Sequence, residues 1–433
     1  MGRNKERIPG TNRGSLKVRL ILVSVLFVLF GSGLVGRLFF LQVIKNEDLV
    51  SRSRQQHQVT VEMSYGRGFI YDRNMNELAA NIKVESVYAT PQEIRDKKKT
   101  ALLLAKTLKI DKKLILKKIS SKRNFIWIKR RISPSEFSRL RNNLPLGVNF
   151  MSEDKRFFPK RELASGVIGF TGIDNQGLAG IEHQYDTTLK GNIVRTVIKK
   201  DARGKLVQFN GKFDGQDAEN RGMVLAIDEV IQFFAEHHLN KQVKKYQAKS
   251  GVAIVMNPNT GEVYAIANIP RYNPNNYSAY KPKRWINRAV SDAYEPGSIF
   301  KPILAAATID AGVARPHDIF FCEDGKFSIR GKGIGEAAGH KFGWLTLQNI
   351  ISKSSNIGSV KVAQQLGKKT FYDYIRKFGF GQKTGIALPG EASGRFKELV
   401  AWDERSLASI SFGQEISTTP LQMISAISVI ANG

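Results

Sequence analysis

Residues 295–301 have the sequence EPGSIFK, and an apolar run, 302–311, follows directly. Ser298 and Lys301 form an S-x-x-K motif there, so helical spacing places both on one face, one turn apart. Serine is a weak nucleophile until a base removes its proton, and a lysine in an apolar cleft has a pKa low enough to be that base. The preceding Pro-Gly pair predicts a helix N-terminus, whose N–H groups favour a developing oxyanion. The segment therefore predicts a nucleophile, Ser298, and a general base, Lys301.

S-x-x-K alone is a weak signal, because this chain contains two more copies, at 152–155 and 278–281. We expect the first in an acidic, polar turn and the second in a loop with no apolar helix after it. Ser298 differs because it opens a long apolar helix. An ordinary serine at a helix N-terminus remains the alternative interpretation of this position.

A second motif, S-x-N, consists of Ser354, Ser355 and Asn356 and lies 56 residues after Ser298, between two helical runs. The Ser354 hydroxyl is suited to relay a proton, and the Asn356 amide both donates to and accepts from a peptide-like substrate. A helix cap is the alternative, since serine and asparagine favour caps. The two motifs together match the S-x-x-K plus S-D-N signature of penicillin-binding proteins and class A β-lactamases.

Residues 383–385 spell K-T-G, the third motif of such enzymes, but we do not expect Lys383 to be catalytic. The triplet lies in a segment rich in glycine and proline, which predicts a loop, whereas the third motif belongs on a strand. It also follows Asn356 by only 27 residues. No later K-[ST]-G occurs in the 433 residues, so we expect this chain to be C-terminally incomplete and to acylate poorly or not at all.

Near the N-terminus, residues 20–44 are apolar apart from Arg37 and are long enough to span a bilayer. Residues 1–19 carry six Arg or Lys and one acid, so the positive-inside rule predicts a cytoplasmic tail. The remainder is then extracytoplasmic. A cleaved secretory signal is disfavoured because no small-residue cleavage site follows. A buried core helix is the other alternative.

The chain carries 67 Lys and Arg against 38 Asp and Glu, a formal charge of +29. An extracytoplasmic location disfavours nucleic acid as the partner, and favours anionic lipid head groups and cell-wall carboxylates. Residues 95–131 hold fifteen of the basic residues, which we interpret as a solvated face. Cys322 is the only cysteine and excludes an intrachain disulfide; with Asp324 and His340 it forms no expected metal site.

Three further motifs extend this pattern along the chain. Residues 67–74 read RGFIYDRN and are followed by Met75, residues 177–186 read GLAGIEHQYD, and residues 411–422 include Glu415. With the active-site motifs, they resemble the class B penicillin-binding proteins, most closely the division-specific septal transpeptidases (the FtsI family). In that family glycine is usual at the position of Met75 and frequent at that of Glu415.

The resemblance implies an α+β fold: a transmembrane anchor at 20–44, a pedestal or dimerisation domain at 45–220, and a transpeptidase domain at 221–433. It further implies a peptidoglycan D,D-transpeptidase of septal synthesis, which binds D-Ala-D-Ala stem peptides and is inhibited by β-lactams. No cofactor and no metal is expected. The implied partners are a membrane glycosyltransferase and other division proteins, and the implied location is the inner membrane.

By the same resemblance, Ser298 attacks the penultimate D-alanine carbonyl and Lys301 takes its proton. Ser354 relays a proton to the leaving amine, and Asn356 holds the substrate amide. Two alternatives stay open. One is an elongation-specific class B enzyme with the same chemistry, and the other is a non-catalytic scaffold.

Overall fold

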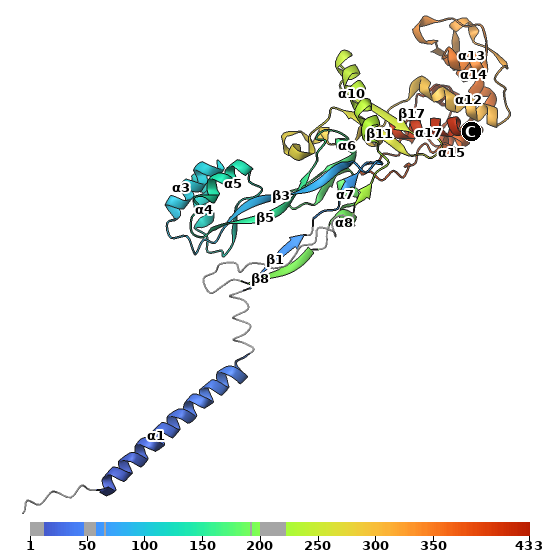
Figure 1. Cartoon of the computed structure of the whole chain (residues 1–433). Helices are drawn as coiled ribbons and strands as arrows, with labels where there is room; N and C mark the ends of the chain where they lie inside the picture. Colours follow the sequence, from blue (N-terminus) through green and yellow to red (C-terminus); the bar gives the residue numbers. More distant parts are fainter. Residues whose placement is uncertain (1–12, 47–57, 65, 191–192, 200–221) are drawn as a thin grey trace, which may run out of the picture. The chain divides into compact units, whose positions relative to one another are not determined.

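The computed structural model describes residues 13–46, 58–64, 66–190, 193–199 and 222–433 (Figure 1). The chain divides into two compact units, one made of residues 1–63 and 193–213, the other of residues 64–192 and 214–433.

The first unit contains the apolar helix α1 (Arg13–Phe39), which continues through the π-helical turn η1 (Phe40–Ile44). Val18–Ile44 is long and apolar enough to cross a membrane, by length and composition. The stretch 20–44 is therefore helical, as the sequence predicts. Strands β1 (Gln58–Ser64) and β8 (Ile193–Lys199) pair with each other.

The second unit begins with a sheet of order β4-β3-β2-β9, in which β5 also pairs with β3. Strands β3 and β5 run antiparallel from Ala80 opposite Phe157 to Ala89 opposite Val148. The S-x-x-K copy at 152–155 lies within β5, so the expected turn is wrong there. The strands of this sheet are β2 (Ile70–Tyr71), β3 (Glu77–Ala89), β4 (Ile126–Lys129), β5 (Val148–Phe157) and β9 (Met223–Val224).

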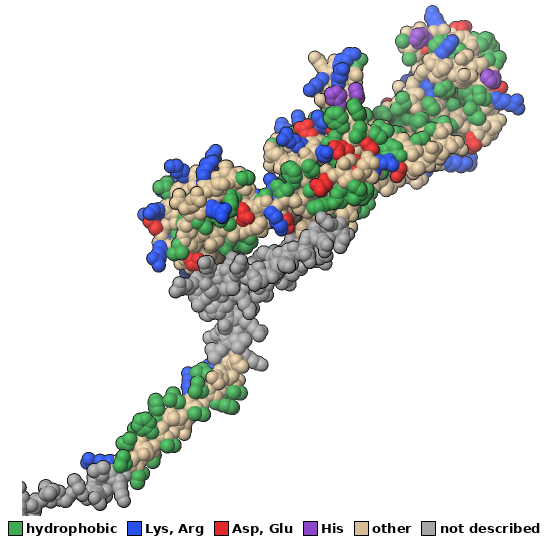
Figure 2. Space-filling view, viewed as in Figure 1, with side chains coloured by type: hydrophobic (Ala, Val, Ile, Leu, Met, Phe, Trp, Pro, Cys, Tyr) green, Lys and Arg blue, Asp and Glu red, His purple; other side chains and the backbone are tan. Residues whose placement is uncertain are grey.

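Three helices, α3 (Lys97–Leu108), α4 (Lys112–Ile119) and α5 (Pro134–Arg141), pack beside β4 and β5. Each begins at a side-chain cap, which is Asp96, Asp111 or Ser133. Such caps satisfy otherwise unpaired backbone N–H groups. Lys and Arg side chains lie at several points on the outside of these helices, among hydrophobic and other side chains (Figure 2), in agreement with a solvated basic face.

Short elements connect this sheet to the remaining part of the unit. Phe170 in β6 stacks on Tyr277 and meets Trp285 edge to face, so one aromatic cluster joins both parts. The connecting elements are α6 (Ser165–Ile168), β6 (Phe170–Thr171), β7 (Gly177–Ala179), α7 (Gly180–Gln184) and α8 (Asp186–Leu189).

Helix α10 (Glu229–Lys245) packs on the antiparallel hairpin of β10 (Gly251–Met256) and β11 (Val263–Ile269), which the sequence predicted. A second, helix-rich core includes Phe300, Ile357 and Phe371. The observed class is therefore α+β. The other elements are η2 (Pro274–Ala279), η3 (Pro282–Arg284), α11 (Arg288–Ser291), η4 (Gly297–Phe300), α12 (Lys301–Asp310), β12 (Ile319–Phe321), η5 (Glu323–Gly325), β13 (Phe327–Ile329), β14 (Lys332–Ile334), η6 (Ala337–Gly339), β15 (Trp344–Thr346), α13 (Leu347–Ser352), α14 (Asn356–Leu366), α15 (Lys368–Lys377), β16 (Arg395–Phe396), η7 (Leu399–Ala401), α16 (Glu404–Ser411), β17 (Ile416–Ser417) and α17 (Pro420–Asn432).

Candidate functional site

Ser298 lies in the 3-10 turn η4, and α12 begins at Lys301. The turn is tighter than the α-helix expected from the sequence, and in a 3-10 turn side chains at i and i+3 eclipse each other. Both residues therefore share one face. Ser298 is exposed whereas Lys301 is only 1% exposed, and the Ser298 hydroxyl makes no hydrogen bond to the described residues.

The turn that carries Ser298 is hydrogen-bonded to the segment 411–418. The Gly297 N–H donates to the Gly413 carbonyl at 2.9 Å, and the Glu415 N–H donates to Glu295 at 3.0 Å. Gly297 has φ +62°, and a Cβ on Gly413 would lie 2.1 Å from the Gly297 carbonyl oxygen. Both positions need glycine, because one requires a positive φ and the other requires close backbone contact.

Lys301 reaches the S-x-N motif and joins three oxygens there. Its Nζ donates to the Ser354 carbonyl at 2.6 Å, to the Ser354 Oγ at 3.0 Å and to Asn356 Oδ1 at 2.9 Å. Among the ion pairs of the described residues, none involves Lys301. The structure thus brings together three of the four predicted site residues by direct contact, with Ser298 one turn away on η4.

The surroundings of Lys301 decide its protonation. Burial lowers the pKa of Lys301 from its ordinary 10.5 to about 8, and the charge of Glu336 offsets part of that shift. Near neutral pH a useful fraction of the amine is then neutral. A neutral amine has a lone pair that can accept a proton from a nearby hydroxyl. The hydroxyls available are those of Ser354 and Ser298.

The S-x-N motif forms the turn between α13 and α14. Ser355 is the N-cap of α14, and its hydroxyl accepts from the Gly358 N–H at 2.9 Å. The cap that was the alternative interpretation is therefore real, but it belongs to Ser355. Ser354, with φ +56°, and Asn356 remain free to face Lys301. A left-handed non-glycine residue is strained and is often found at functional sites.

Glu336 is a residue of this site that the sequence reasoning missed. It is 9% exposed and accepts hydrogen bonds from the Ser355 hydroxyl and the Asn356 N–H, each at 2.6 Å. It lies 20 residues before Asn356 in a segment where glycine repeats, and no active-site motif includes it. No local sequence signal marks Glu336, because only the fold brings it to its partners.

The remaining candidates lie outside this cluster. Residues 383–385 form a loop in which the Thr384 N–H and hydroxyl donate to Glu391 at 2.6 and 2.5 Å, so the triplet is on no strand. Cys322 is buried, as predicted, while His340 is exposed. No group of three potential metal ligands occurs among the described residues. Poor acylation by the 433-residue chain stays a prediction.

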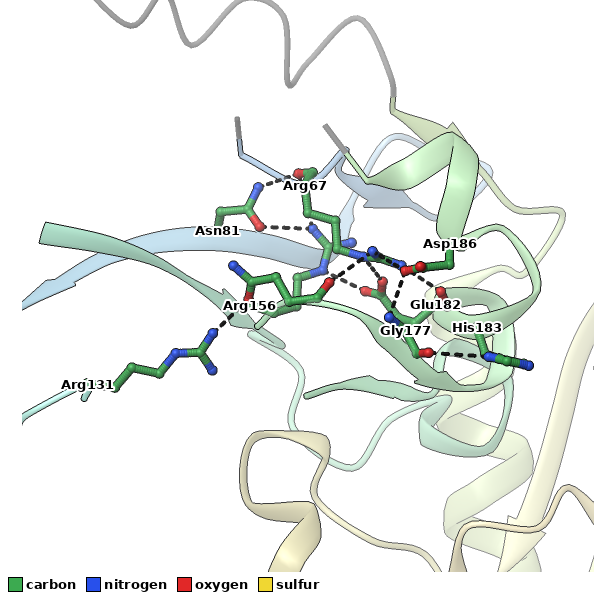
Figure 3. A network of polar contacts seen from close by, with 9 residues as sticks. Arg67, Asn81, Arg131, Arg156, Gly177, Glu182, His183 and Asp186 are labelled. Carbon is green, nitrogen blue, oxygen red and sulfur yellow. Dashed lines mark hydrogen bonds and ion pairs between the residues drawn. The ribbon is translucent and has the colours of Figure 1, made fainter. Parts of the chain in front are cut away.

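A second polar cluster joins two motifs of the pedestal (Figure 3). Glu182 binds Arg67 through one carboxylate oxygen and Arg156 through the other, the latter at 2.6 Å. These three side chains are at most 3% exposed. Arg67 also binds Asp186 at 2.6 Å, and Asp186 accepts from the Gly177 N–H. The motifs at 67–74 and 177–186 therefore meet in space and serve packing.

With the geometry established, the chain can be compared with known proteins. Residues 63–221 match the family described as Penicillin-binding Protein dimerisation domain. Residues 251–433 match the family described as Penicillin binding protein transpeptidase domain. The Ser298, Lys301, Ser354 and Asn356 cluster lies within the second match, and the Arg67 network lies within the first.

Curated relatives extend the likeness over nearly the whole chain. Peptidoglycan D,D-transpeptidase FtsI of Escherichia coli (strain K12) is 32% identical over 92% of this chain and 68% of its own length. Stage V sporulation protein D of Bacillus subtilis (strain 168) is 32% identical over 97% of this chain and 66% of its own length. At equal identity, these relatives do not separate a division role from a sporulation role.

A solved structure supports the fold. The crystal structure of a peptidoglycan synthetase from Bifidobacterium adolescentis ATCC 15703 matches with a TM-score of 0.64 and 26% sequence identity. The match covers 87% of this chain and 73% of the other. The likeness therefore includes both the sheet that follows the anchor and the helix-rich part with the site.

Proposed function

Because this chain belongs to the class B penicillin-binding proteins, a family of serine-type peptidoglycan D,D-transpeptidases, we propose that it cross-links stem peptides during septal wall synthesis. The observation that carries the proposal is the triple contact of the buried Lys301 with Ser354 and Asn356. Lysines whose pKa is lowered by burial in this way, here to about 8, are frequent at functional sites.

In the proposed reaction, the Ser298 oxygen bonds to the penultimate D-alanine carbonyl while the neutral amine of Lys301 takes its proton. The bond to the terminal D-alanine nitrogen then breaks, and the proton that Lys301 took passes through Ser354 to that leaving amine. Asn356 holds the donor peptide through its amide group. The amine of a neighbouring stem finally attacks the acyl-enzyme carbonyl and forms the cross-link, while the ester bond to Ser298 breaks and a proton of that amine returns to the Ser298 oxygen through Lys301.

Only the chain's own residues take part in these steps, and the proposal needs no cofactor or metal. A β-lactam presents its strained amide in place of D-Ala-D-Ala and leaves Ser298 acylated. The lower pKa of Lys301 makes this attack possible near neutral pH.

The proposed placement puts residues 1–19 in the cytoplasm, 20–44 in the inner membrane, and both the pedestal (45–220) and the transpeptidase domain (221–433) outside. The apolar helix Val18–Ile44 and the basic residues before it support this orientation. The proposed partners are a membrane glycosyltransferase and other division proteins, bound through the anchor and the pedestal.

The test is covalent labelling with a fluorescent penicillin, using membranes that contain the anchored chain. We expect slow labelling that Ser298→Ala abolishes. Ser278→Ala is a matched control, because Ser278 belongs to another S-x-x-K copy and lies in η2. Labelling that survives in Ser298→Ala would contradict the proposed nucleophile.

The two alternatives predict other outcomes. If the wild-type chain takes no label and Ser298→Ala still complements a depleted strain, the chain is a scaffold. If a fluorescent fusion distributes along the side wall and is absent from mid-cell, the role is elongation. The proposal requires that any label lies on Ser298 and that the chain is enriched at mid-cell.

A further inference from the structure

Glu336 is a buried carboxylate that the proposed reaction does not use. It follows β14 directly and is 9% exposed. Among the ion pairs of the described residues, none includes Glu336. Burying a carboxylate without a paired cation is costly unless hydrogen bonds stabilise the charge.

Within the part of the chain that the structure describes, the hydrogen bonds of Glu336 come from the start of α14. Its Oε1 accepts from the Ser355 hydroxyl at 2.6 Å and the Ile357 N–H at 3.4 Å, while Oε2 accepts from the Asn356 N–H at 2.6 Å. These backbone groups are the unpaired donors of the first helical turn, where the helix dipole also favours a negative charge. The carboxylate is thus fixed by the same turn that carries the S-x-N motif.

The residue before Glu336 orients the Asn356 side chain. The Asn356 Nδ2 donates to the Gly335 carbonyl at 3.0 Å, which is an acceptor only. The Oδ1 atom is therefore turned toward Lys301 Nζ, 2.9 Å away. Gly335 and Glu336 together hold the backbone and the side chain of the residue that Lys301 contacts.

The charge of Glu336 also acts on Lys301, and it limits how far burial lowers the pKa of the amine. Lys301 is buried with only neutral oxygens as hydrogen-bond acceptors, and the Glu336 charge raises its pKa against the effect of burial. Without that charge, the amine would be protonated over a narrower range of pH.

We propose that Glu336 is a positioning residue of this site: it holds the first turn of α14 so that Ser354 and Asn356 stay on Lys301, and it supplies the nearby negative charge. The role rests on the proposed function, because holding Ser354 and Asn356 on Lys301 matters for catalysis only if Lys301 is the base. Cys322 packs against the same Ser355 hydroxyl at 3.7 Å and completes the buried side of the turn.

The test measures the titration of Lys301 itself, by trace acetylation of the full membrane-anchored chain at a series of pH values and mass spectrometry of the peptide. Glu336→Gln should lower the Lys301 midpoint by about half a pH unit or more, because the charge is lost. Glu323→Gln is the matched control. Glu323 pairs with Lys361 of α14 at 2.7 Å but makes no hydrogen bond to Ser355 or Asn356. The Lys301 midpoint in Glu323→Gln should therefore match that of the wild type.

Glu336→Asp keeps the charge but shortens the side chain, so one of the two 2.6 Å contacts is lost. We expect acetylation of neutral Lys301 at high pH to become several-fold faster, since Asn356 is held less firmly. This variant tests the positioning role even where Glu336→Gln fails to fold.

A purely structural Glu336 would lower the melting temperature in both variants while leaving the Lys301 midpoint and high-pH acetylation rate unchanged. An unchanged Lys301 midpoint in folded Glu336→Gln would overturn the proposal. An unchanged high-pH acetylation rate in folded Glu336→Asp would overturn it as well. Because acetylation does not depend on acylation of Ser298, its outcome is separate from the penicillin-labelling test. Absence of penicillin label in the wild type, together with complementation by Ser298→Ala, would count against the proposed function alone.

Discussion

Two regions of this molecule bury cations to the same depth and surround them differently. In the pedestal, Arg67 and Arg156 are 2% and 3% exposed and share the carboxylate of Glu182. In the transpeptidase part, Lys301 is 1% exposed and donates to a carbonyl, a hydroxyl and an amide oxygen. The first arrangement compensates the charge fully, and the second leaves it only partly compensated.

The difference follows from the chemistry of the two side chains. Guanidinium stays protonated in proteins and matches a carboxylate in a planar, two-pronged geometry. Although burial lowers the pKa of Arg156, the Glu182 carboxylate opposes that shift. Lysine loses its proton readily when buried, and the pKa of Lys301 falls to about 8. A buried cation can therefore serve stability in one place and proton transfer in another.

The largest expected effect is on the pedestal. Glu182→Gln would leave two buried guanidiniums with Asp186 as the remaining carboxylate of the network, so we expect a loss of about 3–5 kcal/mol in unfolding free energy. Urea unfolding of the full chain in detergent, followed by tryptophan fluorescence, measures it. A loss below about 1 kcal/mol would contradict the view that Glu182 compensates both charges.

The matched control for that experiment is Asp373→Asn on α15. Asp373 pairs with Lys369 at 3.0 Å, but the side chains of this pair are 48% and 79% exposed. Solvent screens such a pair, so its loss should cost at most about 0.5 kcal/mol. The contrast isolates burial as the cause of the larger effect.

A second, smaller effect concerns pH at Lys301. The rate of labelling by a fluorescent penicillin should rise about tenfold per pH unit below the Lys301 midpoint and level off above it, because only the neutral amine takes the Ser298 proton. The midpoint should lie at about 8. Because the folded-state pKa is below the ordinary value, the unfolded chain binds more protons between about 8 and 10.5, and Lys301 makes stability rise with pH there.

Lys301→Met is the control for this profile. It keeps most of the unbranched side chain, removes the base and should reduce labelling by about 10²–10³-fold at pH 8. The residual labelling rate of this variant should not rise and level off with pH around the midpoint measured for Lys301 in the wild type. If that pH dependence persists in Lys301→Met, another group controls acylation, and the contrast between the two buried cations loses its functional meaning.

The sequence predicted the parts of both regions that local spacing controls. Ser298 and Lys301 are three residues apart, so any helical turn places them on one face, and the hairpin at 251–269 follows from two apolar runs around a turn. Glu336 could not be predicted, because its partners lie about 20 residues away and only the folded turn brings them together. Likewise, Arg67 and Glu182 meet across 115 residues, a pairing that no local pattern encodes.

The two departures from the family's glycine pattern can also be explained. Met75 has φ +65° and Glu415 has φ +58°, so both occupy the left-handed region that glycine adopts without strain. Met75 belongs to the turn beside β2 of the pedestal, and Glu415 belongs to the segment behind the Ser298 turn. The same backbone feature therefore occurs once in each of the two regions.

The smallest expected effect comes from restoring these glycines. Met75 is 60% exposed, so Met75→Gly loses little packing, relieves the backbone and should stabilise the chain by about 0.5–1 kcal/mol. Glu415 binds Lys397 at 2.9 Å and Ser406 at 3.2 Å, so in Glu415→Gly the lost contacts offset the relief. We expect a change within about 0.5 kcal/mol there. Thermal unfolding of the two variants side by side measures both, and equal stabilisation would show that the Glu415 contacts contribute nothing to holding the segment behind Ser298.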